Sequence, residues 1–290
     1  MVDPALHRKG LAITALGVMI LTLDTPLLRL IDGNQWSVMF WRGLMMFAAV
    51  VFWWTLWGRR TPDNKTFING QKGLIVIAGY TMSNVCFMVS VHNTSVANVL
   101  FIVALTPLVA AIMSIFILRE HPRPSTWIAI FFSLCGIGFI FKDSLTSGHL
   151  YGDVVAFGAA MGLATAFVFT RKYNLNMVTA PGIAGLFTAL IAVSFIADFS
   201  FAPLQWFYLT LNGLIILPIS FGLIALGPRY IPSAEVAMLM LLETIFGPFF
   251  VWLVVAEAPG PNSLIGGAVV VITLMVHSAW RLRRGSRIAG

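Results

Sequence analysis

The chain has 290 residues, of which 59% are hydrophobic and 10% are charged, whereas a soluble domain is typically about 25% charged. So few polar side chains cannot cover a water-soluble particle of this size, which excludes a cytosolic enzyme, a secreted scaffold and a disordered regulator. The net charge of +7 does not indicate nucleic-acid binding, because no basic patch is interleaved with aromatic residues on a polar face. The composition predicts an all-α integral membrane protein.

A membrane-spanning helix needs about 20 mostly apolar residues, and ten segments meet this requirement. Their residues do not alternate between apolar and polar as in membrane strands, so each segment is predicted to be a helix. The predicted spans are 10–30, 36–57, 72–92, 96–118, 125–141, 151–170, 179–198, 205–226, 233–255 and 263–281. The links between them are short, which leaves no room for a soluble domain. The first span is expected to be an uncleaved helix, because its apolar run is too long for the core of a signal peptide.

The basic residues predict how the spans are oriented. If the N-terminus lies on side A and the spans alternate, then all 18 Lys and Arg residues except Arg29, Arg42 and Lys142 lie on side A. Cytoplasmic loops of membrane proteins carry an excess of Lys and Arg, so side A is predicted to be cytoplasmic. We therefore expect a multi-pass protein of the cell inner membrane with both termini in the cytoplasm.

The chain contains an internal repeat. Two pairs of matching residues are 142 positions apart and two more are 137 apart. These pairs are Gly10 with Gly152, Arg29 with Arg171, Thr106 with Glu243, and Glu120 with Glu257. Each half holds five predicted spans, and an odd number of spans inverts the second half relative to the first. The sequence therefore predicts two inverted five-helix repeats, 1–145 and 146–290.

These features resemble the drug/metabolite transporter superfamily, in particular its ten-helix, two-repeat (EamA-type) members. The resemblance is carried by Phe40-Trp41-Arg42, by Thr106-Pro107 with Leu118-Arg119-Glu120, and by Leu241-Leu242-Glu243-Thr244 with Glu257. Thr244 stands where members usually have a proline, and Val255-Ala256 departs from the usual small residue and glycine. The resemblance implies export of small metabolites through a central cavity between the repeats. The most similar branch is the bacterial amino-acid exporters, including those for aromatic amino acids.

Asp24 and Arg42 are expected to pair. Asp24 lies 8 residues before Asp32, and Arg42 lies 8 residues after Asn34, so both are roughly 12 Å inside side B at about 1.5 Å per residue. A charged side chain at this depth needs a partner or a wet cavity. The pair acts as a gate, or Arg42 binds a substrate carboxylate, or the pair is a static contact that specifies packing.

Glu243 lies 11 residues from Pro232 and 14 from Glu257, near the middle of the ninth span. Asp24 and Glu243 are the acidic residues expected deep in the membrane. The Glu243 carboxylate is expected to bind a substrate ammonium group or to carry a coupling proton, unless it is a hydrogen-bonded packing residue. Neutral polar residues expected to line the same cavity are Tyr80, Asn84, Asn98, Thr106 and Ser220. Such a cavity suits a zwitterion, although each neutral residue could instead make an ordinary hydrogen bond between helices.

The predicted function is secondary active or facilitative export of small metabolites, probably best represented by amino acids, through alternating access. The chain has no GxxxxGK[ST] phosphate loop and no HExxH or similar catalytic set, so we expect no enzyme activity, cofactor or metal. Exporters of other solutes or drugs, a channel-like protein and an intramembrane enzyme are the alternatives. Gly158 and Gly162 predict close helix packing, within the chain or between copies, which leaves a homo-oligomer open. The expected partners are a small-molecule substrate and the lipid bilayer.

Overall fold

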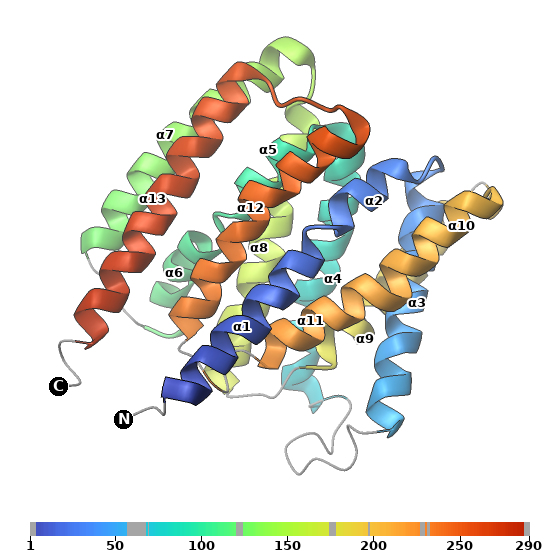
Figure 1. Cartoon of the computed structure of the whole chain (residues 1–290), viewed down its shortest axis with the longest axis horizontal. Coiled ribbons are helices and arrows are strands. Elements are labelled where there is room, and N and C mark those ends of the chain that lie inside the picture. The colour runs from blue at the N-terminus through green and yellow to red at the C-terminus, as the bar shows by residue number, and fades with distance from the viewer. Residues whose placement is uncertain are drawn as a thin grey trace.

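The computed structural model describes residues 4–56, 68, 70–119, 124–173, 178–196, 198–226, 230 and 233–286. Every regular element within these ranges is a helix, and Figure 1 shows the helices gathered in one bundle. In chain order they are α1 (Pro4–Leu21), α2 (Asp24–Leu30), α3 (Gln35–Leu56), α4 (Gly70–Asn93), α5 (Val96–Val103), α6 (Thr106–Ile117), α7 (Pro124–Ser147), α8 (Leu150–Tyr173), α9 (Ala180–Val193), α10 (Pro203–Thr210), the π-helix η3 (Leu211–Ile216), α11 (Leu217–Leu226), α12 (Ser233–Val255) and α13 (Pro261–Ser286). The prediction of an all-helical fold is confirmed.

Seven helical segments within the described residues are long and apolar enough to cross a bilayer. They are Leu6–Leu30, Gln35–Leu56, Gly70–Asn93, Val96–Ile117, Pro124–Lys142, Leu150–Tyr173 and Pro203–Ile224. Shorter apolar helices, Ala180–Val193, Leu239–Val255 and Pro261–His277, overlap the other predicted spans. The start of α1 and the end of α13 lie at the same end of the bundle (Figure 1). The chain therefore has several membrane spans, while the number ten and the cytoplasmic position of the termini stay predictions.

Two of the predicted spans are interrupted near their middle. α1 ends at Leu21 before α2 begins at Asp24, and α5 ends at Val103 before α6 begins at Thr106. Pro107 in the first turn of α6 has no N–H to donate to the carbonyl of Val103, and the Thr106 hydroxyl donates to that oxygen instead, at 2.6 Å. Each break separates a short helix, α2 or α5, from the longer helix that shares its span.

The largest contacts between helices run from one half of the chain to the other. α3 packs along α9, α7 along α13, α4 along α8, and α1 along α11. Exchanging the equivalent spans of the two halves converts the α4–α8 contact into the α1–α11 contact and leaves the other two contacts unchanged. This packing is expected for two repeats related by a twofold axis. The segments 1–145 and 146–290 therefore interleave in a single bundle.

Glycines allow the halves to approach closely. A Cβ atom on Gly43 of α3 would collide with the carbonyl oxygen of Gly185 on α9, and a Cβ on Gly185 would lie 2.7 Å from the carbonyl oxygen of Gly43. These glycines are 142 residues apart, which is the spacing of the sequence repeat. Gly162 packs in the same way against Gly79, and Gly158 meets Cys86. The close packing predicted for Gly158 and Gly162 therefore occurs within one molecule.

Two turns share an unusual backbone conformation. Arg119, which follows α6, has a φ of 56°, and Ala256, which follows α12, has a φ of 55°; they are the non-glycine residues with positive φ in the described part of the chain. They lie 137 residues apart, the same spacing as Glu120 and Glu257. The fourth and ninth predicted spans therefore end in the same kind of turn, which supports the internal repeat. Glu120 itself lies outside the described residues.

Candidate substrate cavity

A cavity of about 100 Å³ lies among helices from both halves of the chain. Helices α1 to α5 line it from the first half, and α8, α9, α11 and α12 line it from the second. Much of its wall is apolar, with methionine and phenylalanine side chains. Its ionisable and other polar side chains are Asp24, Arg42, Tyr80, Ser83, Asn84, Thr188 and Glu243. An apolar pocket with a few converging polar groups is the usual form of a small-molecule site.

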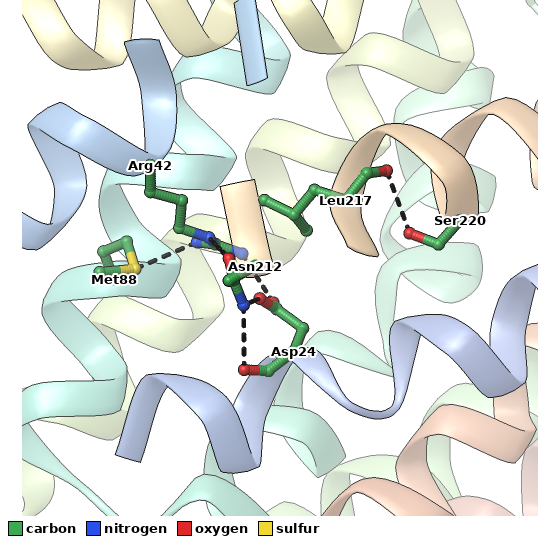
Figure 2. Close-up of polar contacts among 6 residues, drawn as sticks. All are labelled: Asp24, Arg42, Met88, Asn212, Leu217 and Ser220. Atoms are coloured by element: carbon green, nitrogen blue, oxygen red, sulfur yellow. Dashed lines mark hydrogen bonds and ion pairs between the residues drawn. The ribbon is translucent and has the colours of Figure 1, made fainter. Parts of the chain in front are cut away.

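The two charged residues predicted to pair lie in contact at the wall of this cavity. Asp24 Oδ2 lies 2.6 Å from Arg42 Nη2. Asn212 bonds to both, because its Oδ1 accepts from Arg42 Nε at 3.0 Å and its Nδ2 donates to Asp24 Oδ1 at 2.6 Å (Figure 2). Arg42 Nη1 also donates to the sulfur of Met88 at 3.1 Å. We call Asp24, Arg42 and Asn212 the buried triad. It joins α2 and α3 of the first half to η3 of the second.

An irregular stretch of helix presents Asn212 to the triad. Helices α10 and α11 are joined by η3, whose hydrogen bonds are those of a π-helix. A π-helical turn holds more residues than an α-helical turn, so it changes which side chains face a neighbouring helix, and such turns are frequent at functional sites. Asn212 is fully buried, and Gly213 beside it lets the strongly curved segment approach Met45 of α3. Asn212 is not among the predicted site residues. Its only signal in the sequence is an amide within an apolar span.

The buried triad has the properties of a permanent contact. The side chains of Arg42 and Asp24 are only 10% and 5% exposed, and each nitrogen of the guanidinium has an acceptor. Removing one member of a buried ion pair costs about 3–5 kcal/mol, because the other charge stays buried without compensation. This geometry favours the static alternative over a gate that breaks in every cycle. Because Asp24 balances Arg42, the triad adds no net charge to the cavity.

Glu243 has a different environment. Its half-buried side chain lines the cavity within electrostatic range of both Asp24 and Arg42. No residue that the structure describes donates a hydrogen bond to its carboxylate. An ionised Glu243 therefore contributes one negative charge that the triad does not balance. This charge is available to a cation in the cavity.

The neutral polar wall is partly as predicted. Tyr80 and Asn84 line the cavity, and the ring of Tyr80 packs edge-on against Phe167 with 6.4 Å between ring centroids. Thr188 of α9 also lines the cavity, although it is not among the predicted site residues. Its hydroxyl oxygen is buried and has no hydrogen-bond partner within the described residues. The sequence around Thr188 carries no motif that would have identified it.

Thr106 and Ser220 lie outside the cavity, contrary to prediction. The Thr106 hydroxyl donates to the carbonyl of Val103, and the Ser220 hydroxyl donates to the carbonyl of Leu217 at 3.1 Å (Figure 2). Both hydroxyls are buried and satisfied by their own spans. A hydroxyl in a helix can always bond back to a carbonyl one turn earlier, so its presence in an apolar span does not mark a cavity.

Asn98 also lies away from the central cavity. Its amide nitrogen donates to both carboxylate oxygens of Asp153, at 3.2 and 3.3 Å, and Thr94 donates to the same carboxylate at 2.6 Å. Asp153 is fully buried, so the expectation that Asp24 and Glu243 are the deep acids was incomplete. Asn98 instead lines a second cavity of about 670 Å³, beside the ends of α2, α4 and α12. Asp153 begins α8, and its contacts arise only when that helix packs against α4 and α5.

Known proteins are similar to this chain in sequence and in fold. A family model described as the EamA-like transporter family matches residues 8–142 and again residues 150–279. The uncharacterized transporter YwfM of Bacillus subtilis (strain 168) is 28% identical over 213 residues, which cover 67% of this chain and 68% of that protein. A solved crystal structure aligns with a TM-score of 0.68 over 96% of this chain and 99% of that chain, at 13% identity. At this identity the similarity concerns the fold alone.

Proposed function

Because the chain belongs to the EamA-like transporter family, we propose that it exports small metabolites that carry an ammonium group, with amino acids as the principal class. Membrane transport of small solutes is the activity of the family. The substrate class, the direction and the cytoplasmic membrane as the location are our inferences from the cavity and from the charge of the loops.

The position of Glu243 carries the proposal. Its carboxylate faces the cavity beside a triad whose charges cancel, so an ionised Glu243 favours a substrate with a positive group. Tyr80, Asn84 and Thr188 line the same cavity and offer hydroxyl and amide donors to a substrate carboxylate. A zwitterion placed between these groups would satisfy both of its ends.

We further propose alternating access as the mechanism. Both halves line the cavity, and they pack in a pattern that is preserved when their equivalent spans are exchanged. Movement of one half against the other would open the cavity first to one side of the membrane and then to the other. The chain would then act as a secondary or facilitative transporter, driven by a substrate gradient, by exchange or by a coupled proton on Glu243.

A second candidate is an exporter of less polar solutes or drugs. Met39, Met46, Met88 and Met240 line the cavity together with Phe87 and Phe221. Methionine side chains are flexible and polarisable, so a wall rich in them adapts to apolar ligands of different shapes. This candidate predicts transport of apolar cations in preference to amino acids. A channel-like protein or an intramembrane enzyme is supported by no comparable feature of the described residues.

Transport into proteoliposomes by purified protein tests the proposal. We expect saturable, stereoselective uptake of at least one radiolabelled amino acid, and at least a tenfold loss of uptake in Glu243→Gln. Glu257→Gln is a matched control that removes a carboxylate from the same span region outside the cavity. Absence of amino-acid transport together with transport of apolar cations would favour the second candidate. Wild-type uptake by Glu243→Gln at all pH values would exclude the role of Glu243.

A further inference from the structure

A second ion pair joins the two halves at one end of the bundle. Arg29 in the last turn of α2 lies with its Nε 2.8 Å from Glu257 Oε2, just beyond the end of α12. Arg29 Nη2 also donates to the carbonyl of Thr94 at 2.8 Å, and the amide of Val96 donates to Glu257 Oε1 at 2.9 Å. We call these four residues the terminal clasp. It ties α2 and the start of α5, from the first half, to the end of α12 from the second.

The same three helices form a tightly packed layer next to the clasp. The side chain of Leu100 on α5 occupies the space beside Gly247 on α12, where any Cβ would collide with it. Thr25 Oγ1 on α2 lies 3.7 Å from the same point. Leu100 is 2% exposed and Thr25 is 1% exposed, so the layer is closed to solvent.

This layer separates the central cavity from the second cavity. Along each of the three elements, one residue lines the central cavity, the next belongs to the layer, and the third lines the second cavity. The order is Asp24, Thr25 and Arg29 on α2; Val103, Leu100 and Asn98 on α5; and Glu243, Gly247 and Glu257 on and after α12. Any path from the central cavity to this end of the bundle must therefore pass the layer and then the clasp.

We propose that the terminal clasp is the gate at this end of the transporter, and that separation of Arg29 from Glu257 allows the layer to open the central cavity. The proposal rests on the transport function proposed above. The Arg29 and Glu257 side chains are 25% and 26% exposed, in contrast to the buried triad. A partly solvated pair is held weakly, so it can form and break in each cycle, whereas a buried pair cannot.

The sequence repeat agrees with this role. The positions equivalent to Arg29 and Glu257 hold Arg171 and Glu120, which have the same residue types. Ala256 and Arg119, directly before the two glutamates, share the same left-handed backbone. A transporter that opens alternately at its two ends needs a similar device at each, and an inverted repeat supplies one from each half.

Cysteine accessibility tests the gate without measuring transport. The background carries Cys86→Ala and Cys135→Ala, and Ser83→Cys is the reporter, since Ser83 lines the central cavity and is only 9% exposed. A membrane-impermeant maleimide is applied from the side on which a separate His149→Cys reporter reacts, because His149 lines the second cavity. The clasp variants are Arg29→Gln, Glu257→Gln and the double variant. A glutamine at 257 can still accept from Val96, so it removes the charge alone.

We expect each clasp variant to raise the labelling rate of Ser83→Cys about two- to fivefold, which corresponds to the strength of a partly exposed pair. The double variant is expected to label no faster than either single one, because all three remove the same contact. Arg29→Lys, which keeps the charge, is the control and should label close to the parent rate. Unchanged labelling in both single variants, with normal His149→Cys labelling, would overturn the gate, and so would fully additive effects in the double variant.

Salt provides a second measurement that needs no clasp substitution. Raising the ionic strength from low salt to about 1 M shortens the screening length to about 3 Å and should speed labelling of Ser83→Cys with the clasp intact. Salt-independent labelling would contradict the gate. Clasp-dependent labelling in a protein that transports no small solute would instead overturn the proposed function and leave the gate standing.

Discussion

Arg42 Nε donates to the side-chain oxygen of Asn212 at 3.0 Å, and these two residues come from opposite halves of the chain. Asn212 reaches this position because the π-helix η3 turns it toward α3. The bond places a neutral amide between two buried charges, which fixes their arrangement at the cavity wall. The protein thus has two ion pairs of different character: a buried one completed by Asn212, and a partly exposed one between Arg29 and Glu257.

Asn212→Ala should lower the free energy of unfolding by about 1–3 kcal/mol, because it leaves buried polar groups of Arg42 and Asp24 without a partner. Thermal unfolding of the purified protein in detergent measures the change. Asn84→Ala is the matched control, because Asn84 lines the same cavity but makes no hydrogen bond within the described residues. Equal destabilisation by the two variants would contradict the structural role of Asn212.

Arg42→Gln should destabilise the fold by about 3–5 kcal/mol, because Asp24 then stays buried and uncompensated. The double variant Asp24→Asn with Arg42→Gln should be more stable than the single variant, since it removes both charges. The yield of folded protein and its midpoint of thermal unfolding report this order. If the double variant loses the sum of the two single losses, the charges do not interact as the structure indicates.

Thr188→Val should leave stability unchanged or raise it by up to about 1 kcal/mol, because it removes a buried hydroxyl that has no partner and keeps the shape of the side chain. If the hydroxyl binds substrate, the same variant should raise the KM for transport severalfold. Thermal unfolding and uptake kinetics together separate these effects. A clear loss of stability would show that the hydroxyl makes a structural bond.

Gly43→Ala should destabilise the bundle by about 1–3 kcal/mol, because the new methyl group collides with the backbone of Gly185. Gly222→Ala is the control on another helix, where a Cβ meets nothing within 4 Å. Alanine there should instead stabilise the helix by up to about 1 kcal/mol, the usual difference between the two residues. Changes of the same sign in both variants would contradict the close contact between α3 and α9.

Part of the candidate site could be predicted from the sequence, and part could not. Asp24, Arg42 and Glu243 were identifiable because a charge inside an apolar span requires compensation or a cavity. Tyr80 and Asn84 share a helix face with the cavity. Asn98, Thr106 and Ser220 were equally polar, yet they serve other contacts. Asn212 and Thr188 could be placed only when α3 and α9 were seen against their neighbours.

The sequence by itself determined that the chain is helical, crosses a membrane several times and contains a repeat, because lipid requires every backbone group in a span to bond within its own helix. Recurring residues at constant spacing also need no coordinates to be recognised. Only the tertiary structure decided which side chains meet. Spans that are apolar on every face carry no pattern that marks the inward side, so a buried Asp153 and a buried Asn212 could not be recognised before the halves were packed together.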